Sequence, residues 1–228
     1  MWASEGARKD RAGFHIIIRR GTTGGGREMQ DKVAAKVPMT IEEFLAFYEE
    51  RPHGEKWELI EGEPVMSSSP TDWHQVIAAN IVSALATGKV GAGAGWIPAL
   101  GVSTCVPASQ RSLPGPDVMV FEHPLGARRS VKEDALVLFE VLSDSNSPKD
   151  QAWRRRMYAS IPNCRHYVTV DSREAAVVRY DADAHWEAAA SLIRLEQALA
   201  LPALGIAFPL ADIYRWTPLA SPGPNKGE

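Results

Sequence analysis

Apolar residues recur along this chain at helical and then at strand spacing, beginning near Met39. Thr40 and Glu43 have the pattern of a capping box, in which two side chains satisfy free N–H groups at a helix start. The apolar residues that follow at helical spacing are Ile41, Phe44, Leu45 and Tyr48. The pattern therefore predicts a short amphipathic helix that ends before Pro52.

The pattern after this helix predicts alternating helices and strands. In order, we expect a hairpin over 57–66 that turns at Glu61-Gly62, a helix from Ser69 or Thr71 to Gly88, a strand over 96–106, strands over 116–121 and 135–142, a helix over 148–159, a hairpin over 166–180, one or two weaker strands, and a short segment over 210–214. Uninterrupted apolar runs such as 135–142 are typical of strands buried on both faces of a sheet. Together these elements predict one α/β domain, a mixed β-sheet flanked by helices.

The two ends of the chain differ from this pattern. Residues 1–38 are rich in arginine and contain three consecutive glycines, and residues 218–228 are rich in proline and glycine. We expect a basic, disordered extension over 1–38, a folded domain over 39–217 and a disordered tail. A basic arm that grips phosphate is the alternative for the first segment.

Composition and charge narrow the function classes. The net charge of −3 does not by itself indicate nucleic-acid binding, so any such binding must depend on local basic clusters. The two cysteines, Cys105 and Cys164, are far apart in sequence, which argues against a zinc site or a disulfide framework. The chain contains no apolar run of about 20 residues, so we expect a cytoplasmic protein with no membrane partner. Glycines over 91–95 lack the spacing of a dinucleotide-binding loop, so we expect a flexible connection there and no organic cofactor.

Two acidic residues lie at the ends of the predicted core strands. Asp117 begins one apolar run, and Glu140 comes near the end of the other. A carboxylate buried in a sheet is unfavourable unless it is paired or binds a cation. Because carboxylate and carbonyl oxygens are the ligands that Mg²⁺ prefers, we expect a divalent metal held by Asp117, Glu140 and the main-chain carbonyl of Val141.

The predicted helix after Glu140 supplies positive charge. Its basic residues are Lys149, Arg154, Arg155 and Arg156. Asp150, Arg154 and Tyr158 are spaced four residues apart and therefore share one helix face. A cation at this position would stabilise the charge that develops when a phosphodiester is hydrolysed, and Arg154 and Lys149 are the candidates.

These residues together resemble the Uma-type restriction endonucleases, a branch of the PD-(D/E)XK nuclease superfamily. The likeness lies in the segments 115–118, 139–143, 57–63 and 164–171 and in the spacing of Asp150, Arg154 and Tyr158, and it covers about residues 39–215. It implies a restriction-endonuclease-like fold, Asp117 and Glu140 as metal-binding acids, Mg²⁺ as cofactor with Mn²⁺ as a substitute, and DNA as substrate. A homodimer is expected because cutting both strands of a duplex requires two sites.

Several assignments stay open at this stage. Leu142 stands where the superfamily has its lysine, and Arg154 stands where the Uma-type pattern has a lysine. Since arginine stays protonated, it cannot accept a proton from water. The alternative function is therefore a non-catalytic nucleic-acid-binding or assembly module, and a structural oligomer is a third. Glu58 either completes the metal shell or lies on a solvated hairpin face, and His74 is either an accessory ligand or a structural histidine.

Overall fold

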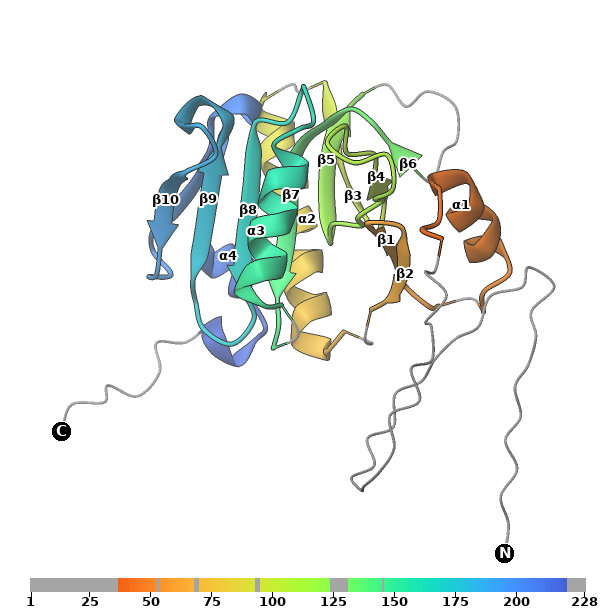
Figure 1. Ribbon diagram of the computed structural model, residues 1–228. Coiled ribbons are helices and arrows are strands. Elements are labelled where there is room, and N and C mark those ends of the chain that lie inside the picture. Colours follow the sequence, from red (N-terminus) through yellow and green to blue (C-terminus); the bar gives the residue numbers. More distant parts are fainter. Residues whose placement is uncertain are drawn as a thin grey trace, which may run out of the picture. The chain divides into compact units, whose positions relative to one another are not determined.

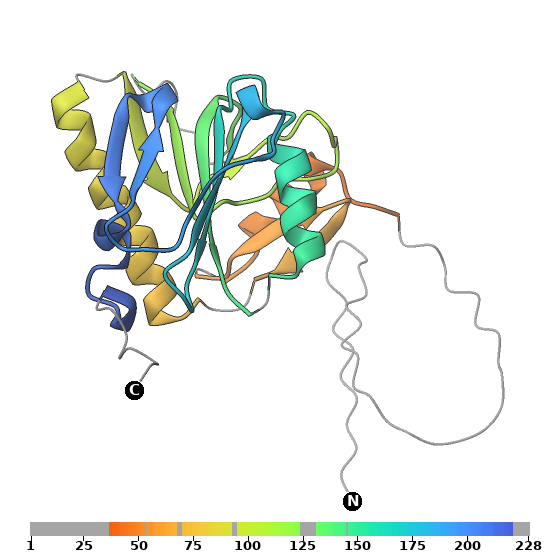
Figure 2. The same ribbon diagram turned by 90° about the vertical axis from the view of Figure 1, so that its left-hand side faces the viewer.

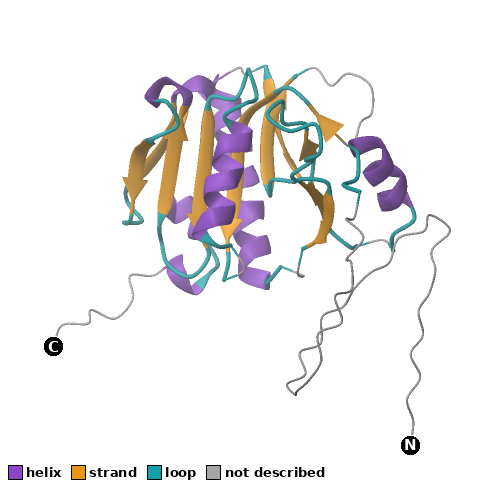
Figure 3. Ribbon diagram, in the orientation of Figure 1, coloured by secondary structure: helices purple, strands orange, loops and turns teal. Residues whose placement is uncertain are grey.

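The computed structural model describes residues 37–220 except 53, 68–69, 93–94, 124–130 and 145, and it contains a six-stranded mixed sheet with helices on both faces (Figure 1). The elements are α1 (Ile41–Glu49), β1 (Trp57–Ile60), β2 (Glu63–Met66), α2 (Asp72–Ala92), β3 (Trp96–Leu100), β4 (Ser103–Thr104), β5 (Val118–Glu122), β6 (Val131–Lys132), β7 (Ala135–Leu142), α3 (Pro148–Tyr158), β8 (His166–Asp171), β9 (Val177–Asp181), β10 (Ala188–Leu192), β11 (Ala198–Leu201), β12 (Ile206–Pro209) and α4 (Leu210–Tyr214). Short 3₁₀ turns cover Ala182–Ala184, Pro202–Leu204 and Pro218–Ala220. Figure 3 shows the alternation of helix and strand that the sequence pattern predicts.

The central sheet has the strand order β10-β9-β8-β7-β5-β3. Within it β7 and β8 are parallel, and the other neighbouring strands are antiparallel. A parallel pair requires a crossover connection. Helix α3 provides this connection, because it follows β7 in sequence and crosses the sheet in front of β7 and β8 (Figure 1).

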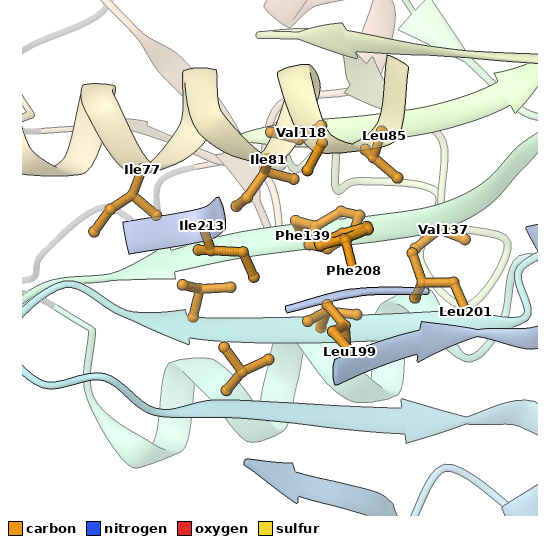
Figure 4. Close-up of a cluster of buried hydrophobic side chains, with 14 of the residues drawn as sticks. Ile77, Ile81, Leu85, Val118, Val137, Phe139, Leu199, Leu201, Phe208 and Ile213 are labelled. Atoms are coloured by element: carbon orange, nitrogen blue, oxygen red, sulfur yellow. The ribbon is translucent and has the colours of Figure 1, made fainter. Parts of the chain in front are cut away.

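Apolar side chains cover both faces of the sheet. On one face α2, α4 and the β11–β12 hairpin pack against the strands, and the side chains of Ile81, Phe139 and Phe208 meet there (Figure 4). On the other face α3 packs through Met157 and Tyr158. Figure 2 shows these two layers on opposite sides of the sheet. Residues of β5 and β7 contribute alternately to both cores, as expected for strands buried on both faces.

The hairpin of β1 and β2 turns tightly at Glu61 and Gly62. Both residues have positive φ, 50° and 85°, as a two-residue type I′ turn requires. A Cβ atom on Gly62 would lie 2.4 Å from the Cβ of Pro38, so the chain preceding α1 also requires glycine here. The turn fixes the pairing in which Glu58 lies opposite Val65.

Two predicted boundaries and one predicted number of strands were wrong. Helix α2 does not end at Gly88 but continues to Ala92, into the segment predicted as a flexible connection. An added Cβ at Gly88 would lie 3.3 Å from side-chain carbons of Ile206, so this glycine permits close packing against β12. The strand predicted over 96–106 is divided by Gly101, whose φ is 63°. The last part of the chain forms three strands where one or two were expected.

The predicted terminal segments fall mostly outside the described residues. Residues 1–36 of the predicted extension and 221–228 of the predicted tail are not described, so these expectations stay predictions. Within the tail as predicted, Pro218–Ala220 forms a 3₁₀ turn, and Leu219 packs against the core. In the described ranges, no helix has the length and apolar character needed to cross a membrane.

Candidate active site

The two predicted acids meet at one end of the central sheet. Strands β5 and β7 are antiparallel neighbours that pair Val118 with Phe139, so Asp117 and Glu140 are adjacent across the two strands. The N–H of Asp117 donates to the carbonyl of Phe139 at 3.1 Å. Side chains of a strand alternate between faces. Asp117 and Glu140 therefore point to the face of Met119 and Leu138, which is the face that α3 covers.

The Asp117 carboxylate is surrounded by donors. Its Oδ1 accepts from Lys56 Nζ at 3.0 Å and lies 3.2 Å from His74 Nε2. Its Oδ2 accepts from the N–H of Val141 at 2.9 Å. Burial opposes ionisation, but the hydrogen bond from His74 and the charge of Lys56 outweigh it and lower the pKa of Asp117 to about 2. Asp117 is therefore a carboxylate at every physiological pH.

Glu140 lies deeper, with 5% of the residue exposed. Its Oε1 accepts from Arg154 Nη1 at 3.0 Å and from the Tyr158 hydroxyl at 2.7 Å. Burial raises the pKa of Glu140 to about 7 despite the charge of Arg154, and the negative charges of Asp117 and Glu58 add to the increase. The two neighbouring acids therefore titrate far apart, an arrangement that occurs often at catalytic sites.

Glu58 belongs to the same cluster of charged side chains as Asp117, Glu140 and Arg154. The prediction that it lies on a solvated hairpin face was wrong. The residue is 4% exposed. Its Oε1 and Oε2 accept from the two terminal nitrogens of Arg154, at 3.0 and 2.6 Å. Its Oε1 also accepts from the N–H of Gly115 at 2.6 Å. Glu58 thereby joins the β1–β2 hairpin to the segment that leads to Asp117.

Helix α3 presents Arg154 and Tyr158 to these acids. The helix begins with Ser147 as N-cap and Pro148 at its first turn, and Asp150 completes a capping box with Ser147. The guanidinium of Arg154 donates to the Tyr158 hydroxyl at 3.3 Å, four residues later on the same face. Glu140 and Glu58 hold the pKa of Arg154 well above its usual value even though burial opposes its charge. Burial and the nearby Glu140 raise the pKa of Tyr158.

The other residues predicted for the site have different surroundings. Asp150 accepts from the N–H and hydroxyl of Ser147 at 3.2 and 2.5 Å, so its carboxylate caps its own helix. Lys149 is exposed in the first turn of α3. Arg155 stacks over the ring of Tyr180 at 4.9 Å, and Arg156 is exposed. Val141 contacts Asp117 through its N–H; the role predicted for its carbonyl stays a prediction.

Sequence reasoning missed Lys56. Its ammonium lies 3.0 Å from Asp117, and Asp117 and Glu140 raise the pKa of Lys56 although burial opposes its charge. One signal pointed to it: Lys56 lies directly before β1 and two residues before Glu58, and residues two apart in extended chain share a face. Only the folded structure shows that Lys56 reaches Asp117, since the two residues are 61 positions apart in the sequence.

The donor set can be compared with the needs of a divalent metal. In the residues that the structure describes, no group of three or more His, Cys, Asp or Glu side chains is arranged to hold an ion. Mg²⁺, however, commonly takes one or two protein carboxylates and fills its remaining positions with water and substrate. Asp117 and Glu140 suit this need, because the charge of Asp117 raises the pKa of Glu140 and a cation would relieve their repulsion. The residues therefore fit Mg²⁺, provided that Lys56 leaves Asp117.

Comparison with known proteins agrees with this fold. The family model described as Uma2, putative restriction endonuclease, matches residues 41–211. Among solved structures, the chain resembles one from Anabaena variabilis described as a putative nuclease belonging to DUF820, with a TM-score of 0.63 and 18% sequence identity. The likeness covers 78% of this chain and 99% of that one, and it concerns the fold. No curated protein matches the chain.

Proposed function

The chain belongs to the Uma2 family of putative restriction endonucleases, and on this premise we propose that it is a metal-dependent endonuclease that hydrolyses DNA phosphodiester bonds. The observation that carries the proposal is the meeting of Asp117 and Glu140 on one face at the ends of β5 and β7. Two electrostatically coupled carboxylates at a sheet end, with cations around them, suit the binding of a divalent metal and an anionic substrate.

Asp117 and Glu140 would hold the Mg²⁺, for which Mn²⁺ can substitute. When bound, the metal would supply an attacking water of lowered pKa and neutralise charge on the phosphate. Asp117 is suited to this role because it stays ionised and the Val141 N–H fixes its orientation. Tyr158 and Arg154 fix the orientation of Glu140.

Arg154 would act by organising the site. Its guanidinium holds Glu58 and Glu140 in one bonded network, and it cannot take a proton from water. In this proposal Arg154 keeps the acids in place and lends positive charge. It does not replace the lysine of the family pattern as a base.

The proposal is tested by changing Asp117→Asn. We expect Mn²⁺ binding in calorimetry and Mg²⁺-dependent nicking of plasmid DNA both to fall by at least about 100-fold, because even outer-shell partners of metal ligands contribute about 10–100-fold. Asp183→Asn is the matched control, since Asp183 is exposed in a 3₁₀ turn that follows β9. Nicking by the Asp117 variant at the wild-type rate would refute the assignment.

A second function is favoured by one specific observation. Arg154 already pairs with both Glu58 and Glu140, and Leu142 occupies the other lysine position. These two features favour nucleic-acid binding without cleavage. Calorimetry with Mg²⁺ or Mn²⁺ separates the two functions. Binding that disappears in Glu140→Gln supports the enzyme, whereas DNA binding without metal binding supports the module.

The remaining expectations stay predictions within this proposal. They are a homodimer, a cytoplasmic location and the absence of an organic cofactor. Sedimentation of the full chain with and without a DNA duplex would test the first of them.

A further inference from the structure

Lys56 differs in its access to solvent from the other nitrogen-bearing side chains that contact the acids. Its side chain is 41% exposed, compared with 13% for Arg154 and 14% for His74. A group that meets an incoming substrate must be reachable from outside. By this criterion Lys56 lies at the open side of the cluster, and Arg154 lies inside it.

Arg154 is not free to leave its position. Its terminal nitrogens donate to Glu58, Glu140 and Tyr158. If the guanidinium moved to a phosphate, it would leave two buried carboxylates without a cationic partner, which is strongly unfavourable. The network therefore holds Arg154 in a structural position.

The main chain of Lys56 is fixed by a hydrogen bond, whereas its ammonium group can change position. Its carbonyl accepts from the N–H of Ser67 at 2.9 Å, next to the paired strands β1 and β2. Its ammonium has three donors on a flexible stem, and Asp117 is the partner to which it is hydrogen-bonded. The stem passes over Gly115, where an added Cβ would lie 3.7 Å from Lys56 Cε. The head can therefore shift while the residue stays anchored.

We propose that Lys56 is a substrate-contacting residue, whose ammonium neutralises Asp117 in the free protein and binds a non-bridging phosphate oxygen when DNA enters. This inference rests on the proposed function and adds a residue to it. A divalent cation held by Asp117 would compete with Lys56 for the carboxylate that Lys56 now contacts. The displaced ammonium would then need an anionic partner, and a phosphate beside the acids would supply one.

The inference is tested by the salt dependence of DNA binding. Binding of a short fluorescent duplex is followed by anisotropy at several KCl concentrations and a fixed Ca²⁺ concentration, and the duplex is checked on a gel for cleavage. Each phosphate contact contributes about 0.9 to the slope of log K against log salt. We expect Lys56→Gln to reduce the slope by about 0.9 and Lys56→Arg to retain it. Arg194→Gln, an equal loss of charge at an exposed residue beyond the edge strand β10, should leave the slope unchanged.

Four results would overturn the inference. A wild-type slope in Lys56→Gln shows that the lysine touches no phosphate and leaves the proposed function intact. A slope in Lys56→Arg as low as in Lys56→Gln shows that the charge is not what matters. An equal fall in Arg194→Gln shows a general charge effect. If the wild-type chain binds no DNA under any condition, both the inference and the proposed function fail.

Discussion

At the scale of single residues, Asp117 and Glu140 have the same acidic group and opposite pKa shifts. Asp117 is in contact with Lys56 and His74 and accepts a main-chain hydrogen bond, so its charged form is favoured. Glu140 is more deeply buried and lies beside two other acids, so its charged form is disfavoured in spite of Arg154. The environment, and not the residue type, decides which acid is ionised.

Glu140→Gln provides a test through the pH dependence of stability. The pKa of Glu140 rises from 4.5 to about 7 on folding, so between these values the folded chain holds a proton that the unfolded chain has released. Wild-type stability should therefore fall, relative to the variant, as pH rises from about 4.5 to 7, and the difference should then stay constant. We expect a change of at most about 3 kcal/mol, measured by urea unfolding in EDTA.

The exposed Glu122→Gln is the control for this measurement, because it removes the same charge at the end of β5. Its stability relative to the wild type should vary little over the same pH range. A difference between Glu140→Gln and wild type that is independent of pH would show that Glu140 is ionised like an exposed acid.

At the scale of elements, helix α3 is the part of the fold that organises the cluster. Its start is fixed by the capping box of Ser147 and Asp150, and Met157 buries one side of it against the sheet. The four-residue spacing then places Arg154 and Tyr158 over Glu140. One guanidinium thus joins α3 to β7 and to β1.

Arg154→Met should be strongly destabilising. Removal of the guanidinium leaves Glu58 and Glu140 buried without their cation. Breaking a buried ion pair in this way lowers the free energy of unfolding by about 3–5 kcal/mol. The free energy of unfolding in urea measures the loss. Arg156→Met, at an exposed position two residues along the same helix, should change it by less than about 0.5 kcal/mol. Equal effects of the two substitutions would show that the network contributes nothing to stability.

The element boundaries that the sequence predicted wrongly involve glycines. Gly88 has the local pattern of a helix stop, yet it lies inside α2, where β12 packs closely against it. Gly101 lies inside an apolar run, yet its positive φ separates β3 from β4. Glycine permits a turn, a helix stop and a close approach alike, and the neighbouring segment decides which of these occurs.

At the scale of the whole molecule, the C-terminal segments close the second face of the sheet. Strands β11 and β12 and helix α4 lie over the central strands next to α2 (Figures 2 and 4). Tyr214, at the end of α4, hydrogen-bonds to the turn between β8 and β9: its hydroxyl accepts from the N–H of Ala176 at 3.1 Å and lies 3.0 and 2.9 Å from the carbonyls of Asp171 and Ala176. Asn80 of α2 donates to the carbonyls of Ile213 and Arg215. The last segments of the chain thereby hold the sheet and α2 together.

Tyr214→Phe should lower the free energy of unfolding by about 1–3 kcal/mol, because it leaves partly buried main-chain groups without their partner. For a chain of this size, each kcal/mol corresponds to a decrease in Tm of about 2–4 °C. Tyr48→Phe removes an exposed hydroxyl contact of 3.4 Å and is expected to have little effect. A Tm for Tyr214→Phe equal to that of the wild type would show that this attachment is not needed for stability.

The sequence by itself determined most of the helices and strands of this protein and the two acids at the ends of its core strands. Apolar periodicity, capping boxes and turn residues act within a few positions, so they predict a helix or a strand locally. The tertiary structure decided which cations meet which acids, since Arg154 lies 96 residues from Glu58 and Lys56 lies 61 residues from Asp117. The physical reason is that a charge selects its partner by distance in space and burial, and no spacing along the chain encodes either until the sheet has formed.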